Sequence, residues 1–250
     1  MGPAPIETHF PRIDEGEGLP VILMHGMFGH CDMWSVQVEA LSPQFRMMAP
    51  EMPIFDHAFV DCTIEGFADY VIRLMDHAQI PRAVLGGNSL GGHVALDIAT
   101  RFPERCLGLV LAGSSGLFER SFDRVPRTPS REWVWERVRQ VFYCEENVPP
   151  GTLEEIESTI GPRENKFRLL KVAKSAKGTH MGSLLNGIHV PTLLAWGIQD
   201  GITPLVVAHE FHQGIAGSRL ELFDKCGHCT MTEHPERFTR LLGEFLGGIA

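Results

Sequence analysis

The chain has 250 residues, of which 44% are hydrophobic and 21% charged, and its formal net charge is −9. These proportions are typical of a globular protein and exclude a disordered or fibrous one. The acidic balance disfavours nucleic acid and anionic membranes as partners. The opening Met-Gly-Pro-Ala-Pro lacks the basic start and apolar run of a secretory signal, and no stretch reaches the roughly 20 apolar residues that span a bilayer. We therefore expect a cytoplasmic protein with one structural domain.

Short apolar runs alternate with helical patterns through the first half of the chain. Residues 20–24 are typical of a buried strand, and they end at His25-Gly26. The elements expected after it are a strand at 46–50, a helix at 63–79 capped by Thr63, a strand at 82–85, a helix at 93–101 and a strand at 106–112. This order predicts an α/β fold with a parallel sheet and helices on both of its faces.

The alternation stops between residues 116 and 187. This segment holds two helical patterns, at 131–142 and 166–176, with several prolines around them. Strands are expected again at 191–196 and 219–223, and a last helix at 235–246. We therefore predict a core formed by residues 1–115 and 188–250, with residues 116–187 inserted as a helical lid.

A possible catalytic turn follows the strand at 82–85. Gly87-Asn88-Ser89-Leu90-Gly91 fits the G-x-S-x-G pattern, in which a serine hydroxyl is exposed on a sharp strand-to-helix turn. Glycines two residues on either side leave room for that turn. The same glycines could belong to an ordinary turn with Ser89 as a bystander, but the flanking strand and helix favour a nucleophile.

A serine nucleophile needs a base, and the base needs a carboxylate to fix its tautomer. In this arrangement the chain order is serine, acid, histidine. Asp200 comes just after the strand at 191–196, and His228 follows the strand at 219–223. Asp224 is a competing acid, although it lies only four residues before His228. Alone, Asp200 could be a turn residue and His228 a surface histidine, but their order predicts a triad of Ser89, Asp200 and His228.

The tetrahedral intermediate of such a reaction also needs two backbone N–H donors. Leu90 directly follows the nucleophile, and Met27 lies in the glycine-rich turn His25-Gly26-Met27-Phe28-Gly29 after the first strand. We expect these two N–H groups to form the oxyanion hole. The chemistry requires no metal and no organic cofactor.

These motifs resemble the α/β-hydrolase family over nearly the whole chain. The matching residues are His25-Gly26 with Gly29, Gly87 to Gly92, Trp196-Gly197 with Asp200 and Pro204, and Gly227-His228 with Glu233, Pro235 and Phe238. The resemblance implies a mostly parallel sheet of eight strands, with reduced edge strands because little chain precedes Pro20. A serine at position 89 argues against the epoxide hydrolases and haloalkane dehalogenases of this superfamily.

Gly-Asn-Ser-Leu-Gly-Gly is similar to hydrolases that cleave carbon–carbon bonds in ring-cleavage products. Those enzymes commonly have an aromatic residue after the catalytic histidine, where Cys229 stands here, and a lid arginine that meets the substrate carboxylate. The sequence does not assign that arginine among its candidates, which are Arg120, Arg124, Arg127, Arg131, Arg137, Arg139, Arg163 and Arg168. We therefore favour a carboxylic ester of a small to medium, apolar molecule as substrate, with carbon–carbon cleavage of a vinylogous diketone as the alternative.

The cysteines allow other interpretations of the sequence. The six cysteines are Cys31, Cys62, Cys106, Cys144, Cys226 and Cys229, and they are expected to be free thiols. Cys226-Gly-His-Cys229 also matches a dithiol redox motif, or half of a zinc site that lacks its second ligand pair.

A ligand receptor on the hydrolase fold would retain the same residues. Aromatic residues of the expected lid, Trp133, Trp135 and Phe142, could line an acyl pocket or pack within the lid itself. The oligomeric state cannot be read from the sequence.

Overall fold

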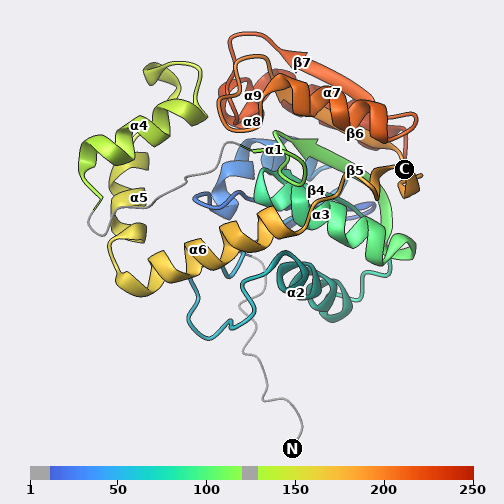
Figure 1. Cartoon of the computed structure of the whole chain (residues 1–250). Coiled ribbons are helices and arrows are strands. Elements are labelled where there is room, and N and C mark those ends of the chain that lie inside the picture. The colour runs from blue at the N-terminus through green and yellow to red at the C-terminus, as the bar shows by residue number, and fades with distance from the viewer. Residues whose placement is uncertain (1–11, 120–128) are drawn as a thin grey trace, which may run out of the picture.

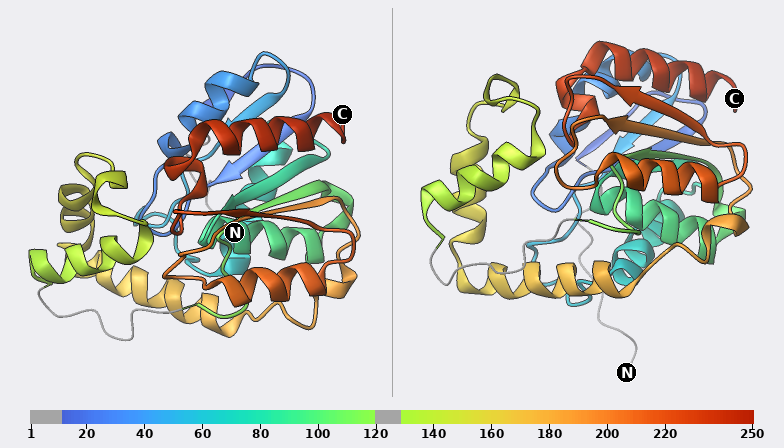
Figure 2. Two further views of the ribbon diagram at one scale, coloured as in Figure 1. Left: turned by 90° about the horizontal axis from the view of Figure 1, so that it is seen from above. Right: turned by 45° about the horizontal axis from the view of Figure 1, so that its top comes forward.

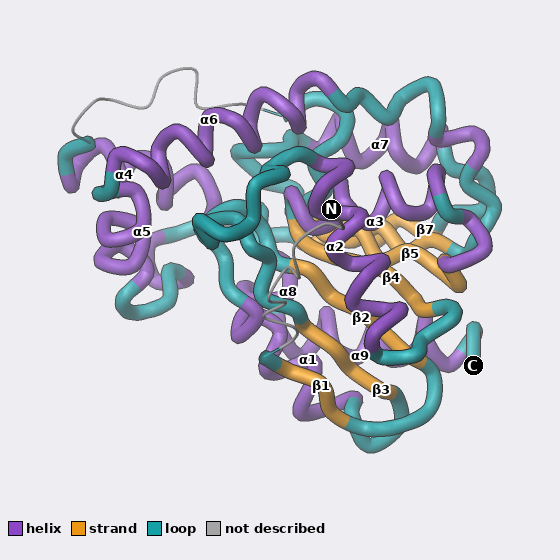
Figure 3. Tube along the Cα trace, turned by 90° about the horizontal axis from the view of Figure 1, so that it is seen from below, coloured by secondary structure: helices purple, strands orange, loops and turns teal. Residues whose placement is uncertain are grey.

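A computed structural model of the chain describes residues 12–119 and 129–250. Those residues form one sheet of seven strands in the order β1-β3-β2-β4-β5-β6-β7 (Figure 3). The strands are β1 (Ile13–Glu15), β2 (Pro20–Met24), β3 (Arg46–Ala49), β4 (Ala83–Asn88), β5 (Cys106–Ala112), β6 (Thr192–Gly197) and β7 (Arg219–Phe223). Every neighbouring pair is parallel except β1 with β3, so the predicted α/β sheet is confirmed.

The expected number of eight strands is wrong for the described residues. Between Arg12, where the described part of the chain begins, and Pro20, one strand occurs, β1, and it is three residues long. The described chain ahead of β2 pairs once, antiparallel to β3, and then turns directly into the sheet. The described edge of the sheet beside β3 is therefore one short antiparallel strand.

Helices cover both faces of the sheet (Figure 1, Figure 2). On one face lie α1 (Ser35–Leu41) and α9 (Pro235–Gly247), and on the other α2 (Ile64–His77), α3 (Leu90–Arg101) and α7 (Leu205–Gly214). The short helix α8 (Thr230–Glu233) leads into α9. Short 3₁₀ turns occupy Cys31–Trp34, Pro103–Arg105, Glu145–Asn147 and Leu185–Gly187.

Successive side chains of the central strands enter two separate hydrophobic cores. In β2, Val21 and Leu23 pack toward α1 and α9, while Ile22 and Met24 pack toward α2 and α3. The strands β5 and β6 alternate in the same way, with Val110 and Leu193 among the residues of the α1/α9 core. Strands buried on both faces therefore read as continuous apolar runs, which is why the sequence identifies them.

Between β5 and β6 the chain forms α4 (Arg131–Val141), α5 (Thr152–Ile160) and α6 (Arg163–Gly178), which we call the inserted helices. They lie to one side of the sheet (Figure 2) and share a small core of Val134, Val138, Ile160 and Leu169. The sequence missed α5, which begins directly after Pro149-Pro150-Gly151. Residues 120–128 of the expected lid lie outside the described residues.

Polar contacts attach α6 to the core. The Arg168 guanidinium donates to the carbonyls of Pro53, Ile54 and Phe59 at 3.2, 2.7 and 2.8 Å. The backbone N–H of Ile64 donates to Ser175 Oγ at 3.0 Å. These contacts hold α6 to the loop before α2 and to the first residue of α2.

Gly87→Ala should destabilise the fold, because its Cβ would lie 2.5 Å from the carbonyl oxygen of Met24 and 2.6 Å from the carbonyl carbon of Gly91. These are backbone atoms of two packed elements, so we expect a loss of about 3 kcal/mol in the free energy of unfolding, measured by chemical denaturation. Gly187→Ala is the control, since nothing lies within 4 Å of its added Cβ. Equal stability of the two variants would contradict the tight crossing at Gly87.

Candidate functional site

Ser89 lies on a strained turn between β4 and α3. Its backbone has φ 54° and ψ −115°, a region that residues other than glycine rarely occupy and that costs about 1–3 kcal/mol. Three backbone hydrogen bonds hold it there: Ser89 N–H donates to Ala112 O, and His93 and Ser115 donate to Ser89 O, each at 3.1 Å. This geometry is the one that the G-x-S-x-G pattern predicts.

Asn88 connects this turn to the loop that carries His228. Its buried side-chain amide donates to Ala112 O and to His228 O, both at 3.0 Å. The sequence pattern leaves this position open, so this contact could not be inferred from it. Asn88 therefore ties the end of β4 to the loop after β7.

Asp200 and His228 are brought together at the ends of β6 and β7. Asp200 Oδ2 lies 2.8 Å from His228 Nδ1, and both residues are buried. The carboxylate also accepts from the N–H groups of Ile202 and Thr203 at 2.8 and 2.9 Å, and from Thr203 Oγ1 at 2.9 Å. With its remaining lone pairs satisfied, the carboxylate can hold the imidazole in one tautomer and orientation.

Asp224, the competing acid, points elsewhere. Its exposed carboxylate accepts from Gln199 Nε2 at 3.1 Å, and that hydrogen bond lowers the pKa of Asp224. Gln199 also accepts from Cys226 N–H through its side-chain oxygen at 3.0 Å. Asp224 is therefore a surface partner of the β6 loop, and Asp200 is the acid beside the histidine.

Gly113, directly after β5, backs the Asp200–His228 pair. A Cβ at Gly113 would lie 2.9 Å from His228 Nδ1 and 3.2 Å from Asp200 Oδ2, and its φ is +52°. A side chain here would collide with both members of the pair. The need for glycine at this position becomes visible only when the strands are placed side by side.

The hydroxyl of Ser89 contacts a second serine. Ser89 Oγ lies 3.5 Å from Ser115 Oγ. In the described residues, the His228 ring is bonded to Asp200 and, at 3.4 Å, to Thr203 Oγ1. Contacts between nucleophile and base are often loose without substrate and tighten in the substrate complex.

The glycine-rich turn after β2 passes close to Ser89. An added Cβ at Gly26 would lie 3.4 Å from Ser89 Cβ, and Gly29 N–H donates to Gly26 O at 3.1 Å to close the turn. Met27 is the next residue, and its side chain packs against both the sheet core and the inserted helices. Leu90 is the first residue of α3, so its N–H has no acceptor within the helix. Leu90 thus directly follows Ser89 in the chain, and Met27 directly follows Gly26, which lies beside Ser89.

The His25 ring connects this turn to the segment after β3 by hydrogen bonds. Met52 N–H donates to His25 Nε2 at 2.9 Å, which places the ring proton on Nδ1, 2.7 Å from Gly26 O. Glu51 lies beside it, with Oε1 3.4 Å from His25 Nε2. Burial opposes ionisation of Glu51, but hydrogen bonds to its carboxylate from His30 Nδ1 at 2.9 Å and from Cys31 N–H at 3.2 Å hold its pKa well below its usual range. No sequence pattern indicated Glu51.

The loop of His228 is bonded directly to the end of α4. His228 N–H donates to Val141 O at 2.6 Å. Glu233, on α8, accepts from Gly227 N–H at 2.7 Å, and from Tyr143 N–H and Asn147 Nδ2 at 2.8 Å each. One carboxylate thus bridges the histidine loop and the segment between α4 and α5.

The Cys226 and Cys229 thiols are free and buried. Burial raises the pKa of both, which opposes the thiolate that dithiol exchange or zinc binding needs. No group of three potential metal-ligating side chains occurs in the described residues. The geometry thus gives the redox and zinc interpretations no support.

The aromatic and arginine side chains of α4 have local partners. Trp133 and Trp135 pack against the small core of the inserted helices, while Arg137 and Arg139 lie over these rings at 5.1 and 5.9 Å. Arg139 also pairs with Glu145. Arg120, Arg124 and Arg127, candidates for a substrate carboxylate, lie outside the described residues.

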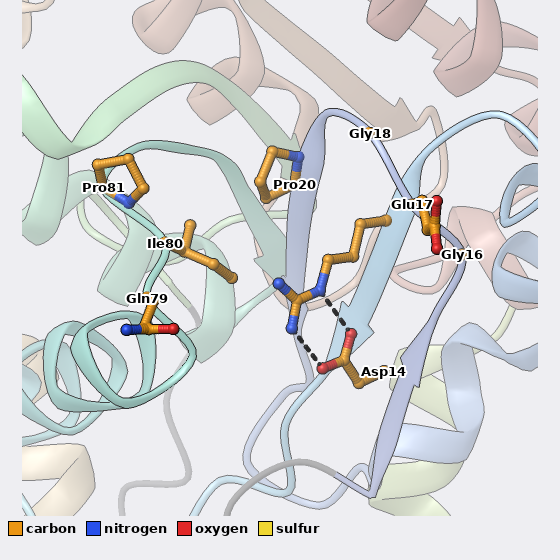
Figure 4. A pocket seen from close by; sticks show the side chains of 9 residues that line it. Asp14, Gly16, Glu17, Gly18, Pro20, Gln79, Ile80 and Pro81 are labelled. Atoms are coloured by element: carbon orange, nitrogen blue, oxygen red, sulfur yellow. Dashed lines mark hydrogen bonds and ion pairs between the residues drawn. The ribbon is translucent and has the colours of Figure 1, made fainter.

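A hollow of about 550 Å³ opens at the other end of the strands, where β2 and β3 begin (Figure 4). It is lined at the amino ends of β2 and β3 by Pro20 and Arg46, and Arg46 donates two hydrogen bonds to Asp14. Ligands of open α/β sheets bind at the carboxyl ends of the strands, where Ser89, Asp200 and His228 lie. The hollow is therefore remote from the candidate site.

Residues 21–241 match the model of the alpha/beta hydrolase family, so the chain belongs to that family and is a hydrolase. The match spans every strand after β1. It agrees with the parallel sheet and with the serine turn at the end of β4. Among the helices of the described residues, none is long and apolar enough to cross a membrane.

Named relatives and solved structures agree with this membership. The chain is 30% identical to a 2-hydroxymuconate semialdehyde hydrolase of Pseudomonas sp. (strain CF600), over 93% of this chain and 88% of that protein. It superposes on a thermophilic esterase from Thermogutta terrifontis with a TM-score of 0.76 at 28% identity, covering 95% and 92% of the two chains. The meta-cleavage product hydrolase of Pseudomonas fluorescens IP01 gives a TM-score of 0.74 at 26% identity, with 95% and 94% covered.

His30 should make the attachment of α5 depend on pH. Its Nδ1 lies 2.9 Å from Glu51 Oε1 and its Nε2 3.0 Å from Glu155 on α5, and the hydrogen bond to Glu51 raises the pKa of His30. The pairing is complete below the ordinary histidine pKa of about 6.5 and is lost as pH rises through the raised value. Amide exchange of α5, corrected for the intrinsic rate, should therefore speed up over that range.

The charges facing His30 are Glu51, Glu155 and, opposing protonation, Arg12. His30→Gln should abolish the pH dependence of exchange in α5. The exposed His57, which lies 3.8 Å from Glu164, provides the control variant His57→Gln. A pH dependence that persists in His30→Gln would contradict the assignment.

Proposed function

We propose that the chain is a serine hydrolase of uncharged carboxylic esters, acting through an acyl-enzyme on Ser89. The observation that carries the proposal is the strained turn at Ser89, placed beside strands that end in the Asp200–His228 pair. A strained serine turn and a hydrogen-bonded acid–histidine pair are the two components of nucleophilic acyl transfer.

In the first half of the reaction, Ser89 Oγ attacks the ester carbonyl and His228 Nε2 takes its proton. Asp200, bonded to Nδ1, stabilises the imidazolium that forms. The N–H groups of Met27 and Leu90 would hold the oxyanion, helped by the N-terminus of α3. His228 then gives its proton to the leaving alcohol, and the C–O bond breaks.

In the second half, His228 takes a proton from water, which attacks the acyl carbon of the ester on Ser89. Collapse of the second tetrahedral intermediate releases the acid and returns the proton to Ser89 Oγ. The buried position of His228 and Asp200 keeps bulk water from competing for their hydrogen bonds. No step needs a group beyond these residues.

We also propose that the inserted helices form the lid of this site. Two contacts support this proposal: Met27 packs against the core of these helices, and Val141 O accepts from His228 N–H. The substrate would then enter between α4 and the turn at residues 25–29. The acyl group would be selected by side chains of this segment.

A second candidate is the hydrolysis of a carbon–carbon bond in a vinylogous diketone. The names of relatives favour it, since the 30% identical protein is a 2-hydroxymuconate semialdehyde hydrolase. The same residues would act, with a carbanion in place of an alkoxide as leaving group. Arg168, an inserted-helix candidate for the substrate carboxylate, instead donates to three carbonyls of the core.

Substrate panels distinguish the two reactions. We expect p-nitrophenyl esters of graded acyl length to be hydrolysed with turnover, and a vinylogous 1,5-diketone to be a poor substrate. Ser89→Ala should abolish both activities while leaving the circular dichroism spectrum unchanged. Fast diketone cleavage with feeble ester hydrolysis would reverse the order of the candidates, and full activity of Ser89→Ala would exclude both.

Asp200→Asn should lower kcat/KM for the best ester by about 10³- to 10⁴-fold, because an amide no longer fixes the productive tautomer of His228. Asp224→Asn is the matched control on the neighbouring loop and should stay near the wild-type value. A larger loss in Asp224→Asn than in Asp200→Asn would show that the wrong acid was chosen.

A further inference from the structure

A carboxylate lies close to the nucleophile, on the side of the residues that follow β5. Ser115 is buried and its Oγ lies 3.5 Å from Ser89 Oγ. Ser115 Oγ in turn donates to Glu119 Oε2 at 2.5 Å. The backbone fixes the pair of serines as well, because Ser115 N–H donates to Ser89 O at 3.1 Å. Glu119 is therefore two hydrogen bonds from the reacting oxygen.

The donor and acceptor of each hydrogen bond between Ser89, Ser115 and Glu119 follow from the chemistry of the side chains. A carboxylate oxygen can only accept, so the Ser115 hydroxyl donates to Glu119. The Ser115 oxygen is left with lone pairs that accept the hydrogen of Ser89. One serine, Ser115, thus separates the negative charge of Glu119 from the nucleophile Ser89. The carboxylate does not occupy the position of the attacking oxygen.

Such a charge discriminates between substrates. Charge–charge interactions are stronger in a partly buried site than in water, because the effective dielectric constant is lower there. An acyl group with its own carboxylate would be repelled by Glu119, whereas an uncharged acyl group would not. The effect grows as substrate and inserted helices exclude water.

Two arginines of the inserted helices, Arg131 and Arg168, bind other groups. Arg168 donates to carbonyls at residues 53, 54 and 59. Arg131 on α4 pairs with Glu154 and Glu157 of α5 at 2.6 and 2.7 Å. Within the part of the chain that the structure describes, these two guanidinium groups therefore have partners other than Glu119.

We propose that Glu119, whose carboxylate accepts a hydrogen bond from Ser115 beside Ser89, is a charge-selecting residue that excludes by its own charge acyl groups that carry a carboxylate near the scissile bond. The substrates would then be esters of uncharged acids. The inference rests on the proposed function in one respect, namely that Ser89 is the nucleophile. It deepens that function by excluding vinylogous diketones that carry a carboxylate, the substrates of the second candidate reaction.

Covalent labelling of Ser89 tests this directly. The probes are two fluorophosphonates of equal chain length, one ending in a methyl group and the other in a carboxylate. Wild-type enzyme should label faster with the neutral probe, and Glu119→Gln should reduce the ratio of the two second-order rates by about tenfold, the size expected for one partly screened charge. Raising the ionic strength should narrow the ratio in wild type but not in Glu119→Gln.

Three variants separate charge from structure. Glu119→Asp keeps the charge and should keep the ratio, and Ser115→Ala should change the absolute rates more than the ratio. Glu104→Gln, at the 3₁₀ turn before β5, is the distant control and should leave the ratio unchanged. An unchanged ratio in Glu119→Gln overturns the inference. If that variant does not fold, a wild-type ratio insensitive to ionic strength overturns it instead.

Mass spectrometry of the labelled protein separates failure of the inference from failure of the proposed function. Labelling of Ser89 with the expected ratio, but without turnover of any ester, would overturn the proposed function and support the charge selection. Ester turnover with equal labelling by both probes would do the opposite. Absence of label on Ser89 with either probe would overturn both.

Discussion

The whole site depends on the backbone of one residue, Ser89, which is held at φ 54° between a parallel strand and a helix. This conformation is unfavourable, and it persists because neighbouring elements approach closely enough to leave no alternative. Gly87 and Gly91 allow the Met24 carbonyl to come within the space of a side chain. Asn88 then bonds the turn to the histidine loop, so the strain at one residue is supported by three strands.

That constraint also explains why the acid and the histidine come from separate strands. The parallel sheet brings the ends of β4, β5, β6 and β7 to one edge, and each end contributes one part of the site. β5 contributes no charged side chain to the triad, but its end provides Gly113, which leaves room for His228 and Asp200. The absence of a side chain at Gly113 is thus as necessary to the site as the presence of the Asp200 and His228 side chains.

Much of this architecture could be predicted from the sequence. The strands β2 and β5 have the predicted bounds, because strands buried on both faces leave continuous apolar runs. The edge strand β7 also has the predicted bounds, although it is only partly buried. The helix α5 was missed, since two prolines and a glycine hide its start. Motif spacing predicted Ser89, Asp200 and His228 as a triad, and the structure brings Asp200 and His228 into contact. The positions of Thr203, Glu51 and Glu119 near these residues depend on contacts in the folded chain. No local pattern records such contacts.

The bond from His228 N–H to the carbonyl of Val141 has a wider consequence. Inserted segments are where members of a fold family diverge, because they can change without disturbing the sheet. Here the final turn of α4 shares a backbone hydrogen bond with His228, the proposed general base, and Glu233 links the same two segments. A shift in the last turn of α4 would therefore change the orientation of the His228 imidazole. The inserted helices of this chain cannot change independently of the site, and a new substrate range requires both to change together.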